Sequence, residues 1–216
     1  MPRSITIALD IMSGDNGPQT ALSGAFKSLQ SISDLNIILV GDQDIISDAI
    51  NDLDDSIKGR IDILHTHEFI RMDEDIIHAV RSKKKSSMRL AINCVKDSRA
   101  QACVSAGNTG ALMSISKIIL KTIEGIDRPA ICTSLPTKKH FMQVLDLGAN
   151  VECTAQNLFQ FAVMGASVVE SLEISKNPRV GLLNIGSEEF KGRNEIKLAA
   201  ELLNKSNINY TGFVEG

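Results

Sequence analysis

Short apolar runs of strand length recur along the chain, and stretches with helical spacing separate most of them. Several runs are nearly continuous rather than alternating, which is typical of strands that are covered on both faces. They predict strands at residues 5–9, 36–40, 61–64, 102–105, 130–135, 142–147, 180–185 and 208–214. Apolar residues at helical spacing predict helices across residues 21–29, 88–95, 158–169 and 196–203.

The alternation of strands and helices predicts an α/β fold. Successive βαβ units build a mainly parallel sheet with helices on both sides. Because no low-complexity linker or internal repeat interrupts the pattern, we expect residues 1–216 to form a single α/β domain. No helix follows the last run, residues 208–214. The pattern alone leaves two interpretations open, an edge strand at a natural terminus and a chain that stops partway through a longer α/β array.

The composition is that of an ordinary soluble globular protein, with 43% hydrophobic and 23% charged residues. A net charge of −3, the absence of Trp and a single Tyr argue against a nucleic-acid binder. No apolar run approaches the roughly 18 residues that are needed to span a bilayer. The cysteines lack metal-site spacing, so we expect no metal and free thiols in a reducing cytoplasm. They are Cys94, Cys103, Cys132 and Cys153.

Polar loops follow four of the predicted strands, at the edge of a parallel sheet where ligands bind. They are rich in Gly, Asn, Ser and Asp and cover residues 10–18, 105–110, 146–150 and 184–192. Any one of them is consistent with a plain turn, whereas four at one edge predict a polar floor of backbone donors and small side chains. In the first loop we expect Asp10, Gly14 and Asp15 to take part in binding.

The loop at residues 105–110 has a local mechanism for binding an anion. Asn108 or Thr109 is a good N-cap for a helix that begins near Gly110. The first turn of a helix presents unpaired N–H groups and a partial positive charge. Gly107 and Gly110 carry no side chain and let a ligand approach the backbone. The loop is therefore either a phosphate or oxyanion cradle or an uneventful capped turn.

A basic stretch at residues 81–89 supports the anion interpretation. Ser86 or Ser87 is expected to cap the following helix, which places three lysines just ahead of a helix N-terminus. The helix dipole disfavours a cation there by roughly 0.3–1 kcal/mol per charge. An anion in the site explains this placement, and the alternative is a solvated lysine run in a loop.

The common nucleotide and nucleophile signatures are missing from the sequence. It contains no G-x-x-x-x-G-K-[ST] P-loop, no G-x-G-x-x-G after the first strand and no G-x-S-x-G elbow. His65 and His67 alternate near a strand end, without an acidic or Cys partner at metal-ligand spacing. We therefore predict neither a metal nor a cofactor, and we expect both histidines to be ordinary loop residues.

Six segments of the chain match one enzyme family. They are IALDIMSGDNGP, RSKKKSSMRLA, VSAGNTGALM, IDRPAI, VLDLGANVEC and RVGLLNIGSEEFKG. In this order they resemble the PlsX family, the phosphate acyltransferases of bacterial phospholipid synthesis, and they span nearly the whole chain. The resemblance implies an enzyme that moves a fatty acyl group from acyl carrier protein to inorganic phosphate. A membrane acyltransferase would pass the resulting acyl phosphate to glycerol 3-phosphate.

The resemblance also implies a fold, an assembly and a location. The fold would be a Rossmann-like three-layer α/β sandwich, similar to phosphotransacetylases and isopropylmalate-type dehydrogenases. The protein would be a cytoplasmic homodimer that associates peripherally with the membrane. Residues 1–216 would be the N-terminal two-thirds of a longer family chain. The sequence departs from the family at Ser13, where a glycine is usual, and at Asp75–His78, which lacks the usual proline.

The expected site holds phosphate near a thioester carbonyl and stabilises the developing oxyanion. Its candidate binding residues are Ser105, Gly107, Asn108, Thr109 and Gly110, with charge and donors from Lys84, Lys85 and Ser87. Asn150 and Asn184 are candidates to orient the carbonyl, and Asp146 and Lys191 to position groups or transfer a proton. Such proton transfer is typically worth about 10²–10⁴ in rate. Asn108 joins Asn150, Asp146 and Lys191 as a catalytic candidate.

Two rival functions remain open at this point. One is a phosphotransacetylase-like or dehydrogenase-like enzyme on the same fold, acting on a CoA or hydroxy-acid substrate. NAD-dependent oxidation would need a ribose-reading acid and metal carboxylates, which the sequence does not place. The other is a truncated, non-catalytic chain that binds phosphate or dimerises without doing chemistry.

Overall fold

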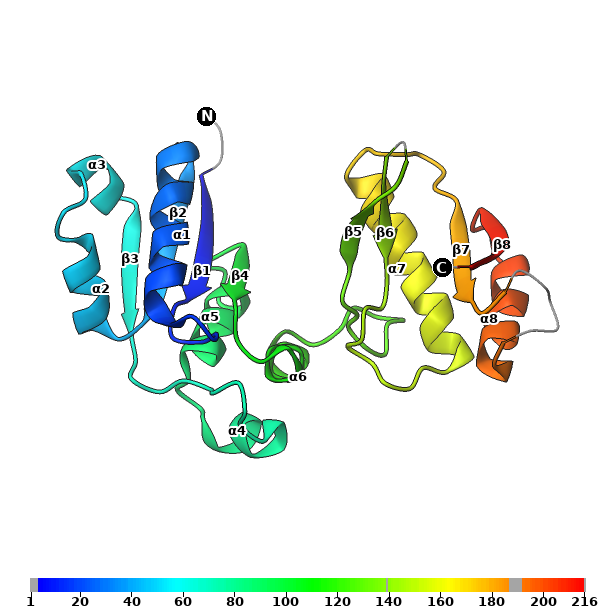
Figure 1. Ribbon diagram of the computed structural model, residues 1–216, viewed down its shortest axis with the longest axis horizontal. Coiled ribbons are helices and arrows are strands. Elements are labelled where there is room, and N and C mark those ends of the chain that lie inside the picture. The colour runs from blue at the N-terminus through cyan, green and yellow to red at the C-terminus, as the bar shows by residue number, and fades with distance from the viewer. Residues whose placement is uncertain (1–3, 139, 187–191, 216) are drawn as a thin grey trace. The chain divides into compact units, whose positions relative to one another are not determined.

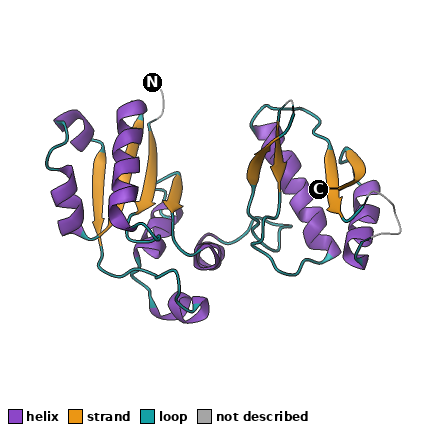
Figure 2. Ribbon diagram, in the orientation of Figure 1, coloured by secondary structure: helices purple, strands orange, loops and turns teal. Residues whose placement is uncertain are grey.

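Strands and helices alternate through the computed structural model, which describes residues 4–138, 140–186 and 192–215 (Figure 1, Figure 2). The chain divides into two units, Met1–Lys121 and Thr122–Gly216. The alternation and the parallel sheet confirm the predicted α/β class. The expectation of a single domain over residues 1–216 stays a prediction.

A four-stranded parallel sheet forms the centre of the first unit, with strand order β3-β2-β1-β4. Its strands are β1 (Ile5–Asp10), β2 (Leu35–Gly41), β3 (Ile61–His65) and β4 (Ala102–Ser105). All four were predicted, with bounds that differ by at most one residue at either end. β2 is almost continuously buried, as its unbroken apolar run indicates.

Three helices pack on one face of this sheet. They are α1 (Gly17–Ser31), α2 (Gln43–Ile50) and α3 (Asp55–Lys58). Leu22 of α1 and Ile46 of α2 share a core with Ile37 and Leu39 of β2. α1 begins with Pro18 in its first turn, where the fixed φ of proline suits a helix start.

The next residues along β2 face the other way, because successive side chains of a strand alternate between faces. Ile38 and Val40 pack with Ala91 in a separate core. The helices that follow in the chain are α4 (Ile76–Ser82), α5 (Ser87–Lys96) and α6 (Thr109–Leu120). Met88 of α5 joins α4 and α6 in a further apolar cluster. Helices therefore cover both faces of the sheet, as predicted.

The second unit contains two small sheets and two helices. The elements are β5 (Thr133–Pro136), β6 (Phe141–Val144), α7 (Ala155–Ser171), β7 (Val180–Asn184), α8 (Asn194–Asn204) and β8 (Tyr210–Glu215). β7 and β8 pair in parallel, and their core contains Leu182 together with Ala199 and Leu203 of α8. Thr154 begins α7 with a capping box that it shares with Asn157.

β5 and β6 depart from the expected βαβ pattern, because they pair antiparallel. Only four residues separate Pro136 from Phe141, and a parallel pairing needs a much longer crossover. β5 also starts later than predicted. Ile131 donates its N–H to the Asp146 carboxylate at 2.7 Å, so a side chain holds this segment where a strand was expected.

Candidate functional site

The carboxyl ends of β1 and β4 meet at one edge of the first unit's sheet. Their register places Asp10 beside Ser105, and the Ser105 hydroxyl donates to the Asp10 carboxylate at 2.7 Å. Asp10 is 1% exposed and also accepts from the Met12 N–H at 3.2 Å. The Gly107 N–H donates to the Ser105 hydroxyl at 3.1 Å. The structure thus brings the predicted residues Asp10, Ser105 and Gly107 together.

Two buried serine hydroxyls lie at the segments that meet here. Ser13 is 3% exposed and Ser87 is fully buried, and neither Oγ has a hydrogen-bond partner among the described residues. A Cβ added at Gly107 would lie 2.6 Å from Ser13 Cβ and 2.7 Å from Met88 Cε. Gly107 therefore touches both the β1–α1 loop and the first turn of α5. An unpaired buried hydroxyl costs about 1–3 kcal/mol, so a ligand that supplies a partner would bind favourably.

Close packing explains three glycines of the predicted site. Gly14 has a φ of 108°, and a Cβ there would lie 3.1 Å from Ala106 Cβ. A Cβ at Gly110 would lie 2.5 Å from Ile76 Cδ1. At Gly107 and Gly110, protein atoms occupy the space that was expected to admit a ligand. Binding by the N–H group of Gly110 stays a prediction.

Asn108 caps α6, which confirms one of the two capping residues that the sequence offered. Its Oδ1 accepts from the Ala111 N–H at 3.0 Å, and its Nδ2 donates to the Met72 carbonyl oxygen at 3.0 Å. Thr109 is the first residue of α6 and is exposed. The Asn108 amide therefore holds two loops in place. Its catalytic role and ligand binding by Thr109 stay predictions.

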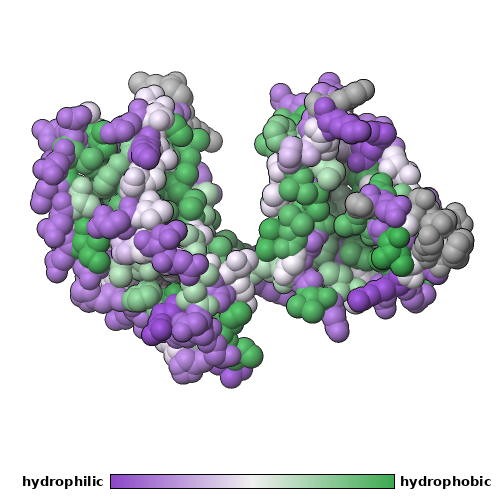
Figure 3. Space-filling view, in the orientation of Figure 1, coloured by the Kyte–Doolittle hydropathy of each residue, from purple (hydrophilic) through white to green (hydrophobic). Residues whose placement is uncertain are grey.

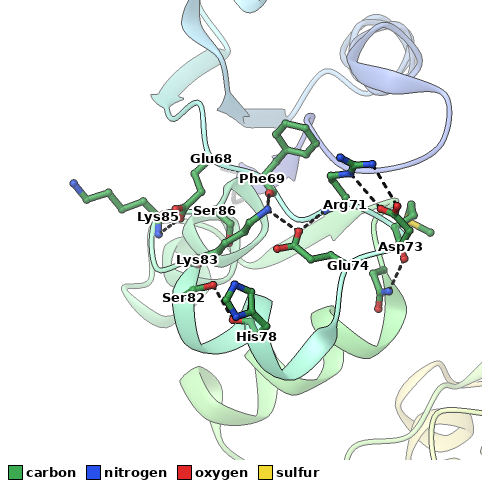
Figure 4. A network of polar contacts seen from close by, with 12 residues as sticks. Glu68, Phe69, Arg71, Asp73, Glu74, His78, Ser82, Lys83, Lys85 and Ser86 are labelled. Carbon is green, nitrogen blue, oxygen red and sulfur yellow. Dashed lines mark hydrogen bonds and ion pairs between the residues drawn. The ribbon is translucent and has the colours of Figure 1, made fainter.

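The basic stretch runs from the end of α4 into the first turn of α5, and its first lysine is neutralised within the protein (Figure 4). Lys83 pairs with Glu74 at 2.6 Å and donates to the Phe69 carbonyl oxygen at 2.6 Å. The hydrogen bond from Lys83 holds the pKa of Glu74 below its ordinary value of 4.5. Lys83 is thus a structural cation rather than a free charge for an anionic ligand.

Lys84 and Lys85, the two lysines that were assigned to the site, are exposed. The Lys84 ammonium donates to the Val80 carbonyl oxygen at 3.2 Å. The Lys85 N–H donates to the Glu68 carboxylate at 2.7 Å, while its ammonium points away from the network in Figure 4. Ser86 is the N-cap of α5 but makes no side-chain capping bond. Phosphate binding by either lysine stays a prediction.

Arg89 is a candidate that sequence reasoning missed. It lies in the first turn of α5, is 9% exposed, and donates from Nη2 to the Val80 carbonyl oxygen at 2.8 Å. Among the described residues, Nε has no hydrogen-bond partner and no carboxylate pairs with the guanidinium. Buried charges are normally paired. Its signal in the sequence was an arginine between the apolar residues Met88 and Leu90, at the end of the basic stretch.

Asp146 and Asn150, two of the catalytic candidates, bind one another in the second unit. The Asp146 carboxylate accepts from the Asn150 N–H at 2.7 Å and from its Nδ2 at 3.2 Å. Asn150 Nδ2 also donates to the Pro129 carbonyl oxygen at 3.0 Å. These bonds hold the loop after β6 against the segment before β5. The catalytic roles of both residues stay predictions.

The remaining predicted residues fall at other places. Asn184 ends β7 and is 7% exposed, with Gly192 packed against its amide. Asp15 is exposed in the loop between β1 and α1. Lys191 lies outside the described residues. Their roles in binding or catalysis stay predictions.

Burial raises the pKa of all four cysteine thiols above their ordinary value of 9.0. For Cys103 on β4, the Asp10 carboxylate adds to this effect. The thiols therefore stay protonated near neutral pH and are weak nucleophiles. In the described part of the chain, no three His, Cys, Asp or Glu side chains gather as a metal site requires. No helix of this part is long and apolar enough to cross a membrane.

Sequence comparison places the chain beside phosphate acyltransferases. The family described as "Fatty acid synthesis protein" matches residues 5–216. A phosphate acyltransferase of Nitrosococcus oceani is 50% identical over 213 residues, which are 99% of this chain and 63% of that protein. One of Methylococcus capsulatus is 50% identical over 211 residues, which are 98% of this chain and 62% of that protein. The chain spans less than two-thirds of the length of these relatives.

Two solved structures share the fold. The EutD phosphotransacetylase from Staphylococcus aureus has a TM-score of 0.68 and 17% identity, and the match covers 98% of this chain and 69% of that one. A branched-chain phosphotransacylase from Enterococcus faecalis has a TM-score of 0.59 and 17% identity, with 97% and 67% covered. At this identity the likeness shows the fold alone. It confirms the predicted similarity to phosphotransacetylase-type folds.

Proposed function

Since the chain belongs to the fatty acid synthesis protein family, we propose that it carries the phosphate site of an acyltransferase that moves a fatty acyl group to inorganic phosphate. Relatives that are 50% identical are named phosphate acyltransferases, which supports acyl transfer. Acyl carrier protein is the proposed donor. Because the chain spans 63% of the Nitrosococcus relative, the activity of the whole protein is part of the proposal.

One observation carries the location of the phosphate site: the hydroxyl of Ser87 is fully buried in the first turn of α5 and has no hydrogen-bond partner among the described residues. Ser13, in the loop between β1 and α1, carries a second buried hydroxyl without a described partner. No side chain caps this turn, and the Ser87 N–H already donates to the Glu68 carbonyl oxygen at 2.8 Å. The partial positive charge of the turn and the N–H groups of Met88 and Arg89 are what it offers to an anion. Arg89 adds a full charge to the same turn. Phosphate supplies acceptor oxygens for the unpartnered hydroxyls and a negative charge for the Arg89 guanidinium.

The reaction needs little covalent catalysis by the protein. A phosphate oxygen attacks the thioester carbonyl carbon, the C–S bond breaks, and the thiolate leaves and takes a proton from solvent. The protein has to hold phosphate near the carbonyl and stabilise the developing oxyanion. A site of hydroxyls, backbone N–H groups and a guanidinium fits these two tasks, and a thiol nucleophile is not required.

The decisive assay measures release of the carrier-protein thiol from acyl carrier protein, with and without inorganic phosphate. We expect release that depends on phosphate, with the full-length Nitrosococcus oceani relative as the active reference. Activity in the relative and none in this chain would show that these residues do not suffice for transfer. Equal use of acyl-CoA and the carrier-protein thioester would favour the phosphotransacylase-like alternative.

Ser87→Ala tests the site within the same proposal. Losing one hydrogen bond to an anion should weaken phosphate binding by about tenfold, measured by calorimetry and as the KM for phosphate. Stability should not fall, because the variant removes an unpartnered buried hydroxyl. Ser82→Ala is the matched control, since Ser82 is exposed and donates to the His78 carbonyl oxygen. Equal phosphate affinity in both variants would remove Ser87 from the site.

Three further assignments rest on the family resemblance. The protein is proposed to be a homodimer, to work in the cytoplasm, and to contact the membrane or its acyltransferase peripherally. Light scattering tests the dimer, and co-sedimentation with anionic lipid vesicles tests the membrane contact. A monomer that stays in the supernatant would contradict both.

A further inference from the structure

A cavity of about 460 Å³ opens in the first unit between α1 and the sheet. Ile7, Leu9 and Val104 line its sheet side, and Ala21 and Gly24 line its α1 side. Figure 3 shows apolar residues beside the paler surface over α1 in this unit. We call this cavity the α1 groove. Its volume lies in the range of small-molecule sites, which are about 300–1,000 Å³.

Packing within the first unit does not require a glycine on the groove side of α1. A Cβ added at Gly24 would meet no heavy atom within 4 Å, unlike one at Gly107. Glycine in the middle of a helix is destabilising relative to alanine, and Gly24 lies in the interior of the 15-residue α1. The sequence thus keeps an unfavourable helix residue where a larger side chain would fit, and the result is an open groove.

The floor of the α1 groove is apolar, and part of it is exposed to solvent. Val104 of β4 is 49% exposed, although it lies on a strand between Cys103 and Ser105. Apolar surface left open in this way favours a ligand of matching chemistry.

One end of the α1 groove is polar and belongs to the candidate site. Asp10 and Ser13 line this end. Ser13 is 3% exposed, and its hydroxyl has no hydrogen-bond partner among the described residues. A ligand that fills the groove therefore has its polar end beside Ser13 and its apolar part between α1 and the sheet. A fatty acyl thioester has this arrangement of polar head and alkyl chain.

We propose that the α1 groove binds the alkyl chain of the acyl donor, with the thioester end directed toward Ser13. This inference rests on the proposed function and adds a location for the acyl chain. The proposal makes Gly24 a specificity-determining residue, because the side chain at this position sets how much of the groove the alkyl chain can occupy. In a helix, a side chain leans toward the preceding turn, so a leucine at position 24 would cover the groove beside Ala21.

The test compares Gly24→Leu with Gly24→Ala in equilibrium binding of cis-parinarate, a fluorescent fatty acid. Gly24→Leu should weaken binding at least about tenfold, since each methylene that loses its contact is worth roughly fourfold. Gly24→Ala should stay within about twofold of the parent. Both variants should unfold at or above the parent's temperature, because each replaces a helix glycine. Ala21→Leu, on the preceding turn, should reproduce the loss.

Donor chain length separates this inference from the proposed function. With hexadecanoyl carrier protein, Gly24→Leu should lose at least about tenfold in kcat/KM, while octanoyl transfer should change little. Phosphate-dependent transfer with an unchanged length profile would overturn the groove and leave the function standing. Parinarate binding that Gly24→Leu abolishes, with no phosphate-dependent transfer by this chain or by the full-length Nitrosococcus oceani relative, would support the groove and overturn the function.

Absence of parinarate binding by the parent chain would overturn the inference outright. If Gly24→Leu then also lowers the unfolding temperature, the groove packs against polypeptide, such as a second copy or a further segment, rather than a lipid chain.

Discussion

Gly107 and Gly24 are both in the first unit, and each has a different reason to be glycine. Gly107 is enclosed by Ser13 and Met88, at 2.6 Å and 2.7 Å from an added Cβ. Gly24 faces open space on α1. The first glycine allows the loops after β1 and β4 to meet α5, and the second leaves the α1 groove open. Stability should therefore respond in opposite directions to the same substitution.

We predict that Gly107→Ala lowers the free energy of unfolding by about 1–3 kcal/mol, the usual cost of overpacking. Gly24→Ala should raise it by about 0.5–1 kcal/mol, through helix propensity. Urea unfolding followed by circular dichroism measures both. A Gly107→Ala protein as stable as the parent would show that Ser13 and Met88 move aside without cost.

At the scale of elements, an ion pair between Lys83 and Glu74 helps to fix the segment from Phe69 to α5. Lys83 reaches back to Glu74, and their side chains are only 24% and 17% exposed. Lys83 also approaches the Phe69 ring, with its ammonium 5.9 Å from the ring centroid. This pair positions the lead into α5, so it supports the first turn that holds Ser87.

Glu74→Gln should destabilise the protein near neutral pH by about 1 kcal/mol. The bond from Lys83 lowers the pKa of Glu74 below 4.5, so its contribution is present above that value and is lost as pH falls through the folded pKa. Parent and variant should therefore converge in strong acid, measured by urea unfolding across pH.

Asp73→Asn is the matched control for the acid experiment. Asp73 pairs with Arg71 at 3.2 Å, but both side chains are mostly exposed, at 73% and 67%. Such pairs contribute little, so stability should barely change. An equal loss in both variants would mean that the partly buried position of the Glu74 pair adds nothing.

Most elements follow from local pattern, and the exceptions have tertiary causes. The strands of the first sheet were predicted because their apolar runs are buried on both faces, as in β2. The antiparallel pairing of β5 and β6 was not, although the short connection between Pro136 and Phe141 contained the signal. The late start of β5 depends on the Asp146 side chain, which apolar periodicity does not register.

For the whole molecule, the proposed phosphate site belongs to the first unit, Met1–Lys121. Asp146, Asn150 and Asn184 belong to the second unit, where hydrogen bonds and packing already engage them. If the first set binds phosphate, the ligand lies in the first unit. If the second set also takes part, the second unit contacts phosphate as well.

Hydrogen exchange with saturating phosphate distinguishes them. Bound phosphate should slow exchange at the first turn of α5 and in the loops after β1 and β4, because ligand binding reduces local opening. The peptides around Asp146 and Asn184 should be unchanged. Protection at these two places would bring the second unit into the phosphate site, and sulfate at equal concentration controls for a general salt effect.

The sequence by itself determined the α/β class, the strands of the first sheet, a cap for α6 at Asn108 or Thr109, and the family. These depend on periodicity and capping, which act over a few residues, or on matching motifs in order. Only the tertiary structure decided that Gly107 meets Ser13 and Met88, that Lys83 is neutralised while Arg89 is not, and that Gly24 opens a groove. Sheet order and helix packing bring these distant segments together, and burial then determines which polar groups lack a partner.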